Sequence, residues 1–360
     1  MTSTTDTYDV VVIGAGLAGA LVAYQLAREG FQVAVLEATD APGGIARRGV
    51  GLAILGTPEP FTHLQERLGT ETAEVIWAHT QENLDLLAAT LQETGQEARR
   101  VGSLRATDDD DVAQQLRESA ILLQQAGYDV ELADATVWGY QAALCALDDL
   151  LFDIEALIPA LLAHPHITLA HSAEVYAIKQ RAETGPGGAP LLSIWARHQY
   201  LMAGGVVLAG GAHAVQLSRS LGSIAHPRQL QSVDLTTEAE LTAPLILHQV
   251  PAIVHQSAAG HWRMVSWASE FGSALENLTA VARQLCPEAR VKTRHSGWVA
   301  QSRDGFPFVG ALPDLPGVYT INGLGAWGMS WAFVAAQRLV AQMLRDEPPG
   351  FLNLDRLFAH

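Results

Sequence analysis

The feature that most constrains the fold is a strand, a glycine-rich turn, a helix and a second strand, all within residues 8–37. Four consecutive apolar residues, Val10–Ile13, are typical of a strand buried on both faces of a parallel sheet. A second apolar run over residues 31–36 ends in Glu37, where a βαβ unit places an acid that accepts hydrogen bonds from ribose hydroxyls. Because every piece stands at its expected spacing, the sequence predicts a dinucleotide site. A plain tight turn is the alternative.

The turn after the first strand has the glycine pattern that a bound pyrophosphate requires. Gly14 permits a tight turn, Gly16 lets the backbone approach the pyrophosphate, and Gly19 lets the next helix pack closely on the sheet. The helix is expected to begin near Leu17 and to run to Gly30. Its first N–H groups, near Leu17 and Ala18, would then point at the phosphates, which are stabilised by the positive end of the helix dipole.

The loop after Glu37 favours FAD over NAD. A pair of glycines shortly after the ribose acid is more typical of FAD-binding oxidoreductases, since it lets a loop run close along the pyrophosphate and the ribityl chain. The predicted cofactor residues of this loop are Ala38, Gly43, Gly44, Ala46, Arg47 and Arg48. For the two arginines, service to anionic groups of the cofactor and a solvated basic turn remain equal alternatives.

Composition excludes several other classes of protein. The formal net charge is −16, from 22 basic and 38 acidic residues, and this argues against an extended nucleic-acid surface, which needs a basic face. Cys145 and Cys286 lie far apart without CxxC spacing, so we expect reduced thiols in a cytoplasmic protein and no metal site. We expect no signal peptide in residues 1–7 and no transmembrane helix, because no apolar run reaches about 18 residues.

A second glycine-containing strand is predicted over residues 205–211. It reads as a further parallel strand of the same sheet, and a helix is expected over 212–221. The residues that we expect at the cofactor here are Ala209, Gly210 and Gly211, together with Val175 on an expected strand over 173–178. About 160 residues separate this strand from the first βαβ unit, so a second domain must be inserted between them.

The middle of the chain predicts mixed elements. Helical spacing covers residues 61–68 and 70–94, and residues 100–105 suggest a strand. The acids at 108–111 are interpreted as the N-cap and first turn of a helix that ends near Gln125, with a metal site as the alternative. Strands are expected over 245–255 and 262–267, where Trp262 and Trp267 are candidates for the wall of a pocket or for ordinary core.

The last sixty residues carry a resemblance to a known family. Residues 303–310 (RDGFPFVG) and 316–329 (PGVYTINGLGAWGM) resemble the closing segment of the D-amino-acid-oxidase-like (DAO) family of FAD oxidoreductases. The resemblance implies an α/β fold: a Rossmann-type, glutathione-reductase-like FAD-binding domain with an inserted α+β substrate domain on a mixed or antiparallel sheet. We expect the FAD-binding domain to comprise residues 1–86, 146–222 and 296–360, and the substrate domain residues 87–145 and 223–295.

The closing segment is also expected to contact the flavin. Its predicted cofactor residues are Gly323, Leu324, Gly325, Ala326, Trp327, Gly328 and Met329. A long helix follows to Leu344, and we expect its N-terminus to face the pyrimidine end of the flavin, where negative charge develops on reduction.

The resemblance implies oxidation of a C–N bond. In this chemistry a hydride passes from the carbon bearing the amine to flavin N5, and the imine hydrolyses in water. The implied partners are a small amine or amino acid and an electron acceptor, either O₂ or a quinone or other carrier. Two alternatives remain: a flavin-binding protein or subunit without amine oxidation, and a tRNA-modifying oxidase module.

The substrate-binding residues depart from the family pattern. Glycine-oxidase-like members hold the substrate carboxylate with two arginines, and Val299 and Ala326 occupy these positions here. Since an unpaired buried carboxylate is costly, we predict poor oxidation of glycine, sarcosine and simple D-amino acids. The preferred substrate should be an amine with an apolar body or an acid held by another cation, first Arg47 or Arg48 and then Arg263. The candidate catalytic or pocket-wall residues are Arg48, His255, Trp298 and Trp327.

Overall fold

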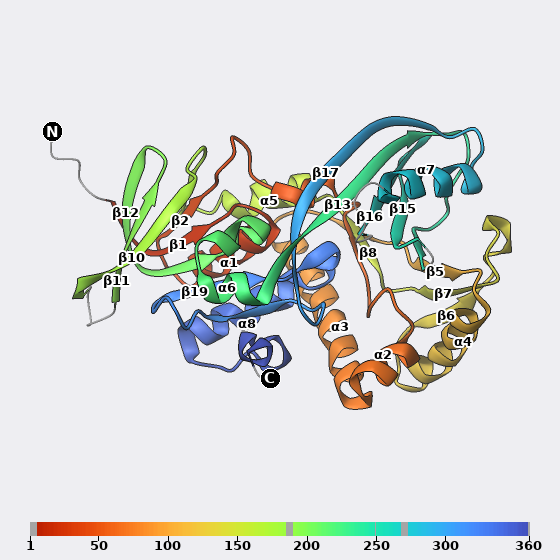
Figure 1. The fold of residues 1–360 in the computed structure, drawn as a ribbon, viewed down its shortest axis with the longest axis horizontal. Helices are drawn as coiled ribbons and strands as arrows, with labels where there is room; N and C mark the ends of the chain where they lie inside the picture. Colours follow the sequence, from red (N-terminus) through yellow and green to blue (C-terminus); the bar gives the residue numbers. More distant parts are fainter. Residues whose placement is uncertain (1–5, 185–189, 249, 268–272, 359–360) are drawn as a thin grey trace.

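The fold is built on two large mixed sheets. The computed structural model describes residues 6–184, 190–248, 250–267 and 273–358 (Figure 1). Each large sheet has eight strands in this part of the chain, and a three-stranded sheet also forms. In the view of Figure 1 the first sheet lies at the left and the second at the right, and the long strands β13 and β17 arch between the two regions.

The first sheet has the predicted βαβ unit at its centre. Its path runs through β10 (Val175–Thr184), β11 (Pro190–Ala196), β12 (Gln199–Leu208), β1 (Asp6–Ile13), β2 (Val33–Leu36) and β9 (Ile167–Ala170), with β19 (Val318–Asn322) and β18 (Phe308–Ala311) attached at β12. Strand β1 is parallel to both β2 and β12, and Val10 pairs with Val33 and with Gly205. The parallel strand predicted at 205–211 is therefore confirmed, although its sheet pairing begins earlier.

Helices cover both faces of β1 with apolar side chains. Val10 and Val12 pack into one cluster with α1, α5 and α8, whereas Val11 and Ile13 pack into a second cluster on the other face. This explains the unbroken apolar run, because a strand buried on both faces has no solvent side. The helices that contribute to the first cluster are α1 (Leu17–Arg28), α2 (Phe61–Leu68), α3 (Thr70–Glu93), α4 (Asp110–Gln125), α5 (Ile154–Leu162) and α8 (Ala332–Arg345).

The second sheet confirms the predicted mixed architecture. Its order is β17 (Arg290–Ser302), β13 (Ala225–Thr236), β16 (His261–Ser266), β15 (Ala252–Ala258), β14 (Leu245–Leu247), β5 (Ser103–Thr107), β7 (Ala142–Ala146) and β6 (Val130–Ala133). Within the described part of this second sheet, β14 and β5 form the only parallel pair, and the other neighbouring strands are antiparallel. Helix α7 (Ser273–Leu285) packs on β13 and β16, and α4 (Asp110–Gln125) packs on β6 and β7.

Local capping decides two boundaries in the chain. Asp109 accepts hydrogen bonds from the N–H groups of Asp111 and Val112 and thereby caps α4, so the capping interpretation of residues 108–111 is confirmed. No group of three or more His, Cys, Asp or Glu side chains suited to a metal ion occurs in the described residues.

The strand expected over 100–105 is wrong as a single strand. Gly102, at φ +61°, separates β4 (Ala98–Arg100) from β5, and the two belong to different sheets.

The helix expected over 212–221 is also wrong. A 3₁₀ turn over Gly211–Gln216 is followed by the separate short helix α6 (Arg219–Ile224). Ser218 is extended, and its Oγ accepts a hydrogen bond from the N–H of Leu221 at 3.1 Å. The Asp314 carboxylate in turn accepts bonds from Ser218 Oγ at 2.9 Å and from Arg219 N–H at 2.8 Å. This cap restarts the helix and breaks the predicted one.

Two features join the two large sheets. Strand β17 runs across residue 296, the expected boundary between the substrate domain and the FAD-binding domain, and it pairs with β13 along its length. The small sheet pairs β8 (Leu150–Phe152) with β3 (Leu52–Ala53) and with β4. None of the helices in the described ranges is long and apolar enough to cross a membrane.

Candidate flavin cradle and active site

Three glycines shape the turn between β1 and α1, each in a different way. A Cβ on Gly14, which has φ +107°, would lie 2.8 Å from the carbonyl oxygen of Ala209, and a Cβ on Gly19 would lie 1.9 Å from the carbonyl oxygen of Gly14. Both glycines therefore serve close packing within the protein. A Cβ on Gly16 would meet nothing within 4 Å. The space above Gly16 is free for a ligand.

The N-terminus of α1 offers donors to that space. Gly16 is the N-cap of the helix and provides no side-chain hydrogen bond to it. The first bond of the helix is formed by Ala20 N–H to the Gly16 carbonyl. The preceding N–H groups, from Leu17 to Gly19, are the donors that a helix leaves without an internal partner. Backbone donors at the positive end of a helix dipole suit a pyrophosphate.

Glu37 is fixed in place beside this turn. Its Oε2 accepts a hydrogen bond from Ala15 N–H at 2.9 Å, and its Oε1 accepts from the N–H and the hydroxyl of Thr39 at 2.9 and 2.8 Å. The residue is only 8% exposed. Each carboxylate oxygen has further lone-pair capacity. The oriented carboxylate can therefore also accept hydrogen bonds from ribose hydroxyls, as predicted.

The loop after Ala38 folds back on the glycine turn. Gly43 N–H donates to the Ala15 carbonyl at 2.8 Å, and Gly43 forms a bridge with Gly16. A 3₁₀ turn over Gly44–Arg48, which includes Ala46, then follows. The bare backbone of Gly44 lies beside Gly16, since a Cβ on Gly44 would be 4.0 Å from Gly16 Cα, whereas the Arg47 side chain covers Gly43.

The two arginines of this loop have partners elsewhere. Arg47 is about half exposed and lies 3.7 Å from the Glu155 carboxylate. Arg48 donates to the backbone carbonyl of Ser296 on β17. For Arg47 this geometry favours the solvated basic turn. Arg48 instead ties the cofactor loop to the second sheet.

The ends of β12 and β19 complete the floor of the cradle. Ala209 N–H donates to the Ile13 carbonyl at 2.9 Å, so the segment Ala209–Gly211 lies directly beside the glycine turn. Asn322 Nδ2 donates a hydrogen bond to the Gly211 carbonyl at 3.1 Å and thereby holds this segment in place. On the other side, Ala173 N–H donates to the Glu37 carbonyl at 2.8 Å, two residues before Val175.

The closing segment differs from the expectation in one respect. Gly323–Met329 passes through a 3₁₀ turn over Gly325–Ser330 before α8 begins, and this stretch includes Leu324 and Gly328. The role expected of the α8 N-terminus stays a prediction, although two of its donors are taken, because Asn83 Oδ1 accepts the Phe333 and Val334 N–H groups at 3.0 and 3.3 Å. The backbone of the glycine turn itself remains available.

Asn83 was not predicted from the sequence. It is fully buried on α3, and its Nδ2 also donates to the Met329 carbonyl at 3.0 Å. Ser330 acts similarly, since its Oγ accepts the Ile54 N–H at 2.8 Å. The only signal for Asn83 was a polar residue within the apolar stripe of a helix, next to Leu84 and Leu87.

One face of the second sheet looks toward the cofactor loop. Arg263 pairs across the sheet with both Asp234 and His255, so these side chains project to the same face. Arg263 Nη1 donates to the Gly49 carbonyl at 3.3 Å. A Cβ on Gly297 would lie 2.0 Å from Ile45 Cδ1. The sheet and the loop after Gly44 are therefore in close contact.

His255 and Trp327 lie on the facing surfaces of this contact. His255 is 9% exposed, and burial, followed by the charges of Arg99 and Arg263, lowers its pKa to about 4. Its imidazole is therefore neutral at neutral pH. The Trp327 ring lies 4.6 Å from the Trp267 ring in an edge-to-face arrangement.

Two other tryptophans face elsewhere. Trp298 is 47% exposed on β17, and its neighbours Gly297 and Val299 face the cofactor loop and the apolar cluster. Since side chains alternate along a strand, the structure does not bring Trp298 to the pocket as predicted. Trp262 is fully buried and packs near Trp138 on the opposite face of the sheet, in its core.

The positions that hold arginines in glycine-oxidase-like proteins meet in an apolar cluster. Val299 packs with Leu230 and Val265, and the partly buried Val50 and Ala326 complete the cluster with Ile45. Val299 and Ala326 therefore offer no charged group to a carboxylate. The guanidinium of Arg48 lies near this face, since its Nη1 is 4.0 Å from a Cβ built on Gly297 and donates to the Ser296 carbonyl.

A buried ion pair supports the loop in front of this cluster. Arg105 donates through Nε to the Thr57 carbonyl at 2.9 Å and through Nη2 to the Leu55 carbonyl. Asp149 accepts the Leu55 N–H at 2.7 Å and lies 4.0 Å from Arg105 Nη1. Burial raises the pKa of Asp149 to about 6, although Arg105 acts in the opposite direction. The sequence analysis did not predict this pair.

The family comparison agrees with this geometry. The model of the FAD dependent oxidoreductase family, DAO, matches residues 9–343. The chain belongs to this family. A curated relative, "Probable oxidoreductase OrdL" from Haemophilus influenzae, is 35% identical over 79 residues, which cover 22% of this chain and 18% of that protein. The match thus spans under a fifth of the relative's length.

Solved structures share the fold over nearly the whole chain. Glycine oxidase from Geobacillus kaustophilus has a TM-score of 0.77 at 18% identity, and the match covers 99% of this chain and 100% of that one. L-proline dehydrogenase from P. horikoshii has a TM-score of 0.78 at 16% identity, covering 98% and 96%. The architecture is thus an FAD-binding fold with a substrate domain, and FAD is the cofactor of the family.

Proposed function

We propose that the protein oxidises the C–N bond of an amine or amino acid, with FAD held in the cradle around Gly16 and Glu37. The observation that carries the proposal is the contact between this cradle and one buried sheet face, made through Arg263 and Gly49. When bound, FAD supplies a two-electron acceptor that takes a hydride from the carbon bearing the amine. Water then hydrolyses the imine, and O₂ or a quinone or other carrier takes the electrons.

The chain's own residues position the substrate. His255, which burial keeps neutral, is assigned as a hydrogen-bond acceptor for the substrate amine. Its low pKa makes it too weak a base to take the proton of an ammonium ion, so the amine reacts in its neutral form. Trp327 and Trp267 form an apolar wall that excludes water from the reacting carbon. Because these two tryptophan rings carry no charge, an uncharged hydrocarbon group beside the amine of the substrate fits against them.

The apolar cluster at Val299 and Ala326 restricts the substrate. A carboxylate buried against Val299, Val265 and Leu230 would meet apolar side chains, while Arg48 at the edge of the cluster is held by the Ser296 carbonyl; the penalty for an unpaired buried ion is several kcal/mol. We therefore expect glycine, sarcosine and D-alanine to reduce the flavin at least about a hundredfold more slowly than an amine with an apolar body.

The test is anaerobic mixing of the purified holoenzyme with these amino acids and with uncharged alkylamines, followed by flavin absorbance. Bleaching by alkylamines but not by glycine is the expected result. A Trp298→Ala variant is the matched control, because this side chain faces away from the pocket and should leave the rates unchanged. A flavin that no amine or amino acid bleaches would overturn the proposal and favour a flavin-binding protein without amine oxidation.

We also propose how the chain is divided into two domains. Residues 1–86, 146–222 and 296–360 form the cofactor domain, and residues 87–145 and 223–295 form the substrate domain, with β17 shared between them. Cys145 and Cys286 are both buried free thiols, and this supports a cytoplasmic protein. Limited proteolysis that releases two stable domains, each contiguous in sequence, would contradict this division.

A further inference from the structure

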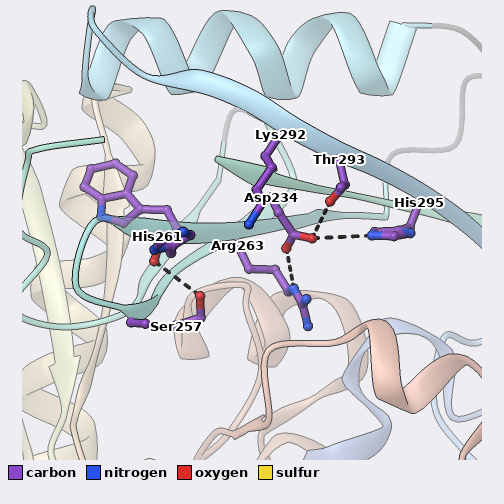
Figure 2. Close-up of a pocket in the computed structure, with 9 residues that line it drawn as sticks. Asp234, Ser257, His261, Arg263, Lys292, Thr293 and His295 are labelled. Atoms are coloured by element: carbon purple, nitrogen blue, oxygen red, sulfur yellow. Dashed lines mark hydrogen bonds and ion pairs between the residues drawn. The ribbon is translucent and has the colours of Figure 1, made fainter. Parts of the chain in front are cut away.

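A cavity of about 450 Å³ opens at the end of the second sheet. It lies where the turn between β15 and β16 meets β13 and β17 (Figure 2). Its polar lining is dominated by basic side chains: Arg263, Lys292, His261 and His295 surround a single acid, Asp234. With His counted as neutral, Arg263 and Lys292 outnumber this acid, in a chain whose formal net charge is −16.

The one acid in the cavity is already paired with its neighbours. Asp234 Oδ1 accepts a bond from Arg263 Nε at 2.7 Å, while Oδ2 accepts from Thr293 Oγ1 at 2.6 Å and lies 3.4 Å from His295 Nε2. Burial works against the charged carboxylate, but these bonds outweigh it and lower the pKa of Asp234. The acid stays ionised and orients Arg263, His295 and Thr293 around itself.

Two of the basic groups, in contrast, keep unused donors. In the described part of the chain, Arg263 uses Nε for Asp234 and Nη1 for Gly49, which leaves Nη2 for a ligand. His261 donates from Nδ1 to the Ala259 carbonyl at 3.0 Å, so its neutral ring offers no second donor. Lys292 forms no ion pair within the described residues.

A break in the strand register aims Lys292 into the cavity. Asp234 pairs with Thr293, but the next residue of β13, Leu235, pairs with Val291, so Lys292 is an extra residue without a partner in the ladder. Such a bulge redirects a side chain that regular alternation would place elsewhere. Figure 2 shows Lys292 extending from β17 alongside Asp234 toward the cavity.

We propose that this cavity binds a carboxylate of the substrate that lies several bonds away from the oxidised C–N bond. The inference rests on the proposed function and deepens it. Arg263 connects the cavity to the cofactor loop through Gly49, while the apolar cluster at Val299 excludes a carboxylate next to the reacting carbon. The substrate class is therefore an amine with a distal carboxylate, joined by an apolar chain that packs against the cluster.

The test compares substrates that differ only in the distal carboxylate. Anaerobic flavin reduction by the holoenzyme is measured with n-butylamine and with δ-aminovalerate, the same chain with a terminal carboxylate. The apparent dissociation constant for δ-aminovalerate should be about ten- to a hundredfold lower, which corresponds to one charged hydrogen bond. A series from β-alanine to ε-aminocaproate should show an optimum in chain length.

Two variants locate the carboxylate. Lys292→Met should abolish the preference for δ-aminovalerate. Arg294→Met is the matched control, because Arg294 is exposed on the same strand and pairs with Val233, whose side chain faces the core on the opposite side. It should leave the preference intact. Equal affinity for the two amines in the wild type, or a preference that survives Lys292→Met, would overturn the proposal.

A binding measurement separates this inference from the proposed oxidation. Calorimetric titration of the holoenzyme with valerate, which has the carboxylate and no amine, should show binding that weakens with salt and disappears in Lys292→Met. If no amine bleaches the flavin, the proposed oxidation fails, and the titration still decides the anion site. Valerate binding that is absent, or unchanged in Lys292→Met, would refute the site even if alkylamines reduce the flavin.

Discussion

Replacing Gly16 with valine should remove the cofactor and leave the fold intact. The backbone of Gly16 has φ −72° and ψ −179°, a conformation that any residue adopts. A Cβ at this position meets no protein atom within 4 Å. Gly14 is the opposite case, because its φ of +107° and the 2.8 Å approach to the Ala209 carbonyl oxygen forbid a side chain in the protein itself.

The two expected effects differ in size. For the protein without cofactor, exchanging glycine for valine at a helix N-cap changes the free energy of unfolding by about 1 kcal/mol or less. For FAD, the valine side chain occupies the space in which the pyrophosphate approaches the N–H groups of α1. Loss of two charge-assisted hydrogen bonds costs about 3–6 kcal/mol, so the dissociation constant should rise by about a hundredfold or more.

The assay has two readouts. Titration of the apoprotein with FAD, followed by flavin fluorescence, gives the dissociation constant, and thermal unfolding of the apoprotein gives the stability. Gly205→Ala is the control, since its Cβ would lie at an ordinary 3.9 Å from Val10 Cγ2 on the same sheet. It should bind FAD normally. A folded Gly16→Val protein that binds FAD within a few-fold of the wild type would refute the placement of the pyrophosphate at α1.

Three further perturbations test the supports of the site. Arg105→Met leaves the Asp149 carboxylate buried without its ion pair and should lower the free energy of unfolding by about 3–5 kcal/mol in urea titrations; wild-type stability would contradict the pairing. Asn83→Leu deprives two N–H groups of α8 of their acceptor and should cost about 2–4 kcal/mol, with faster amide exchange of Phe333 and Val334 as the local readout. His255 has a native pKa of about 4, below the ordinary value of 6.5, so the unfolded state takes up its proton first and stability falls by up to about 3 kcal/mol as the pH drops from about 6.5 to about 4. His255→Leu should flatten this fall; an unchanged pH profile would show that His255 is not the group responsible.

The parts of the fold that the sequence predicted are those with a short-range signal. The βαβ unit has its strands, glycines and acid within thirty residues, and the cap of α4 lies within four residues of Asp109. The apolar run at Val10–Ile13 indicated burial on both faces, which the two clusters confirm. The family resemblance then supplied the long-range order of the remaining segments.

What the sequence did not predict depends on partners far away in the chain. The break in the helix expected over 212–221 depends on Asp314, which binds Ser218 across 96 residues. Asn83 meets Phe333 across 250 residues. The proposed carboxylate-binding cavity depends on one register shift that redirects Lys292, and the sequence of β17 shows no sign of this shift. Such pairings follow only from the assembled fold.

The central position of β1 also determines when the protein can be completed during synthesis. Strand β1 leaves the ribosome first, yet its neighbour β12 ends only at Leu208, and β19, which pairs with β12, ends at Asn322. One edge of β1 therefore stays unpaired during synthesis until β12 has been made. Contacts between residues so far apart in sequence also form slowly. Because the proposed flavin site draws on segments from both ends of the chain, we expect flavin to stabilise the fold only after these segments have been made. A cell short of flavin should therefore accumulate less of the folded protein, instead of a full amount of inactive protein.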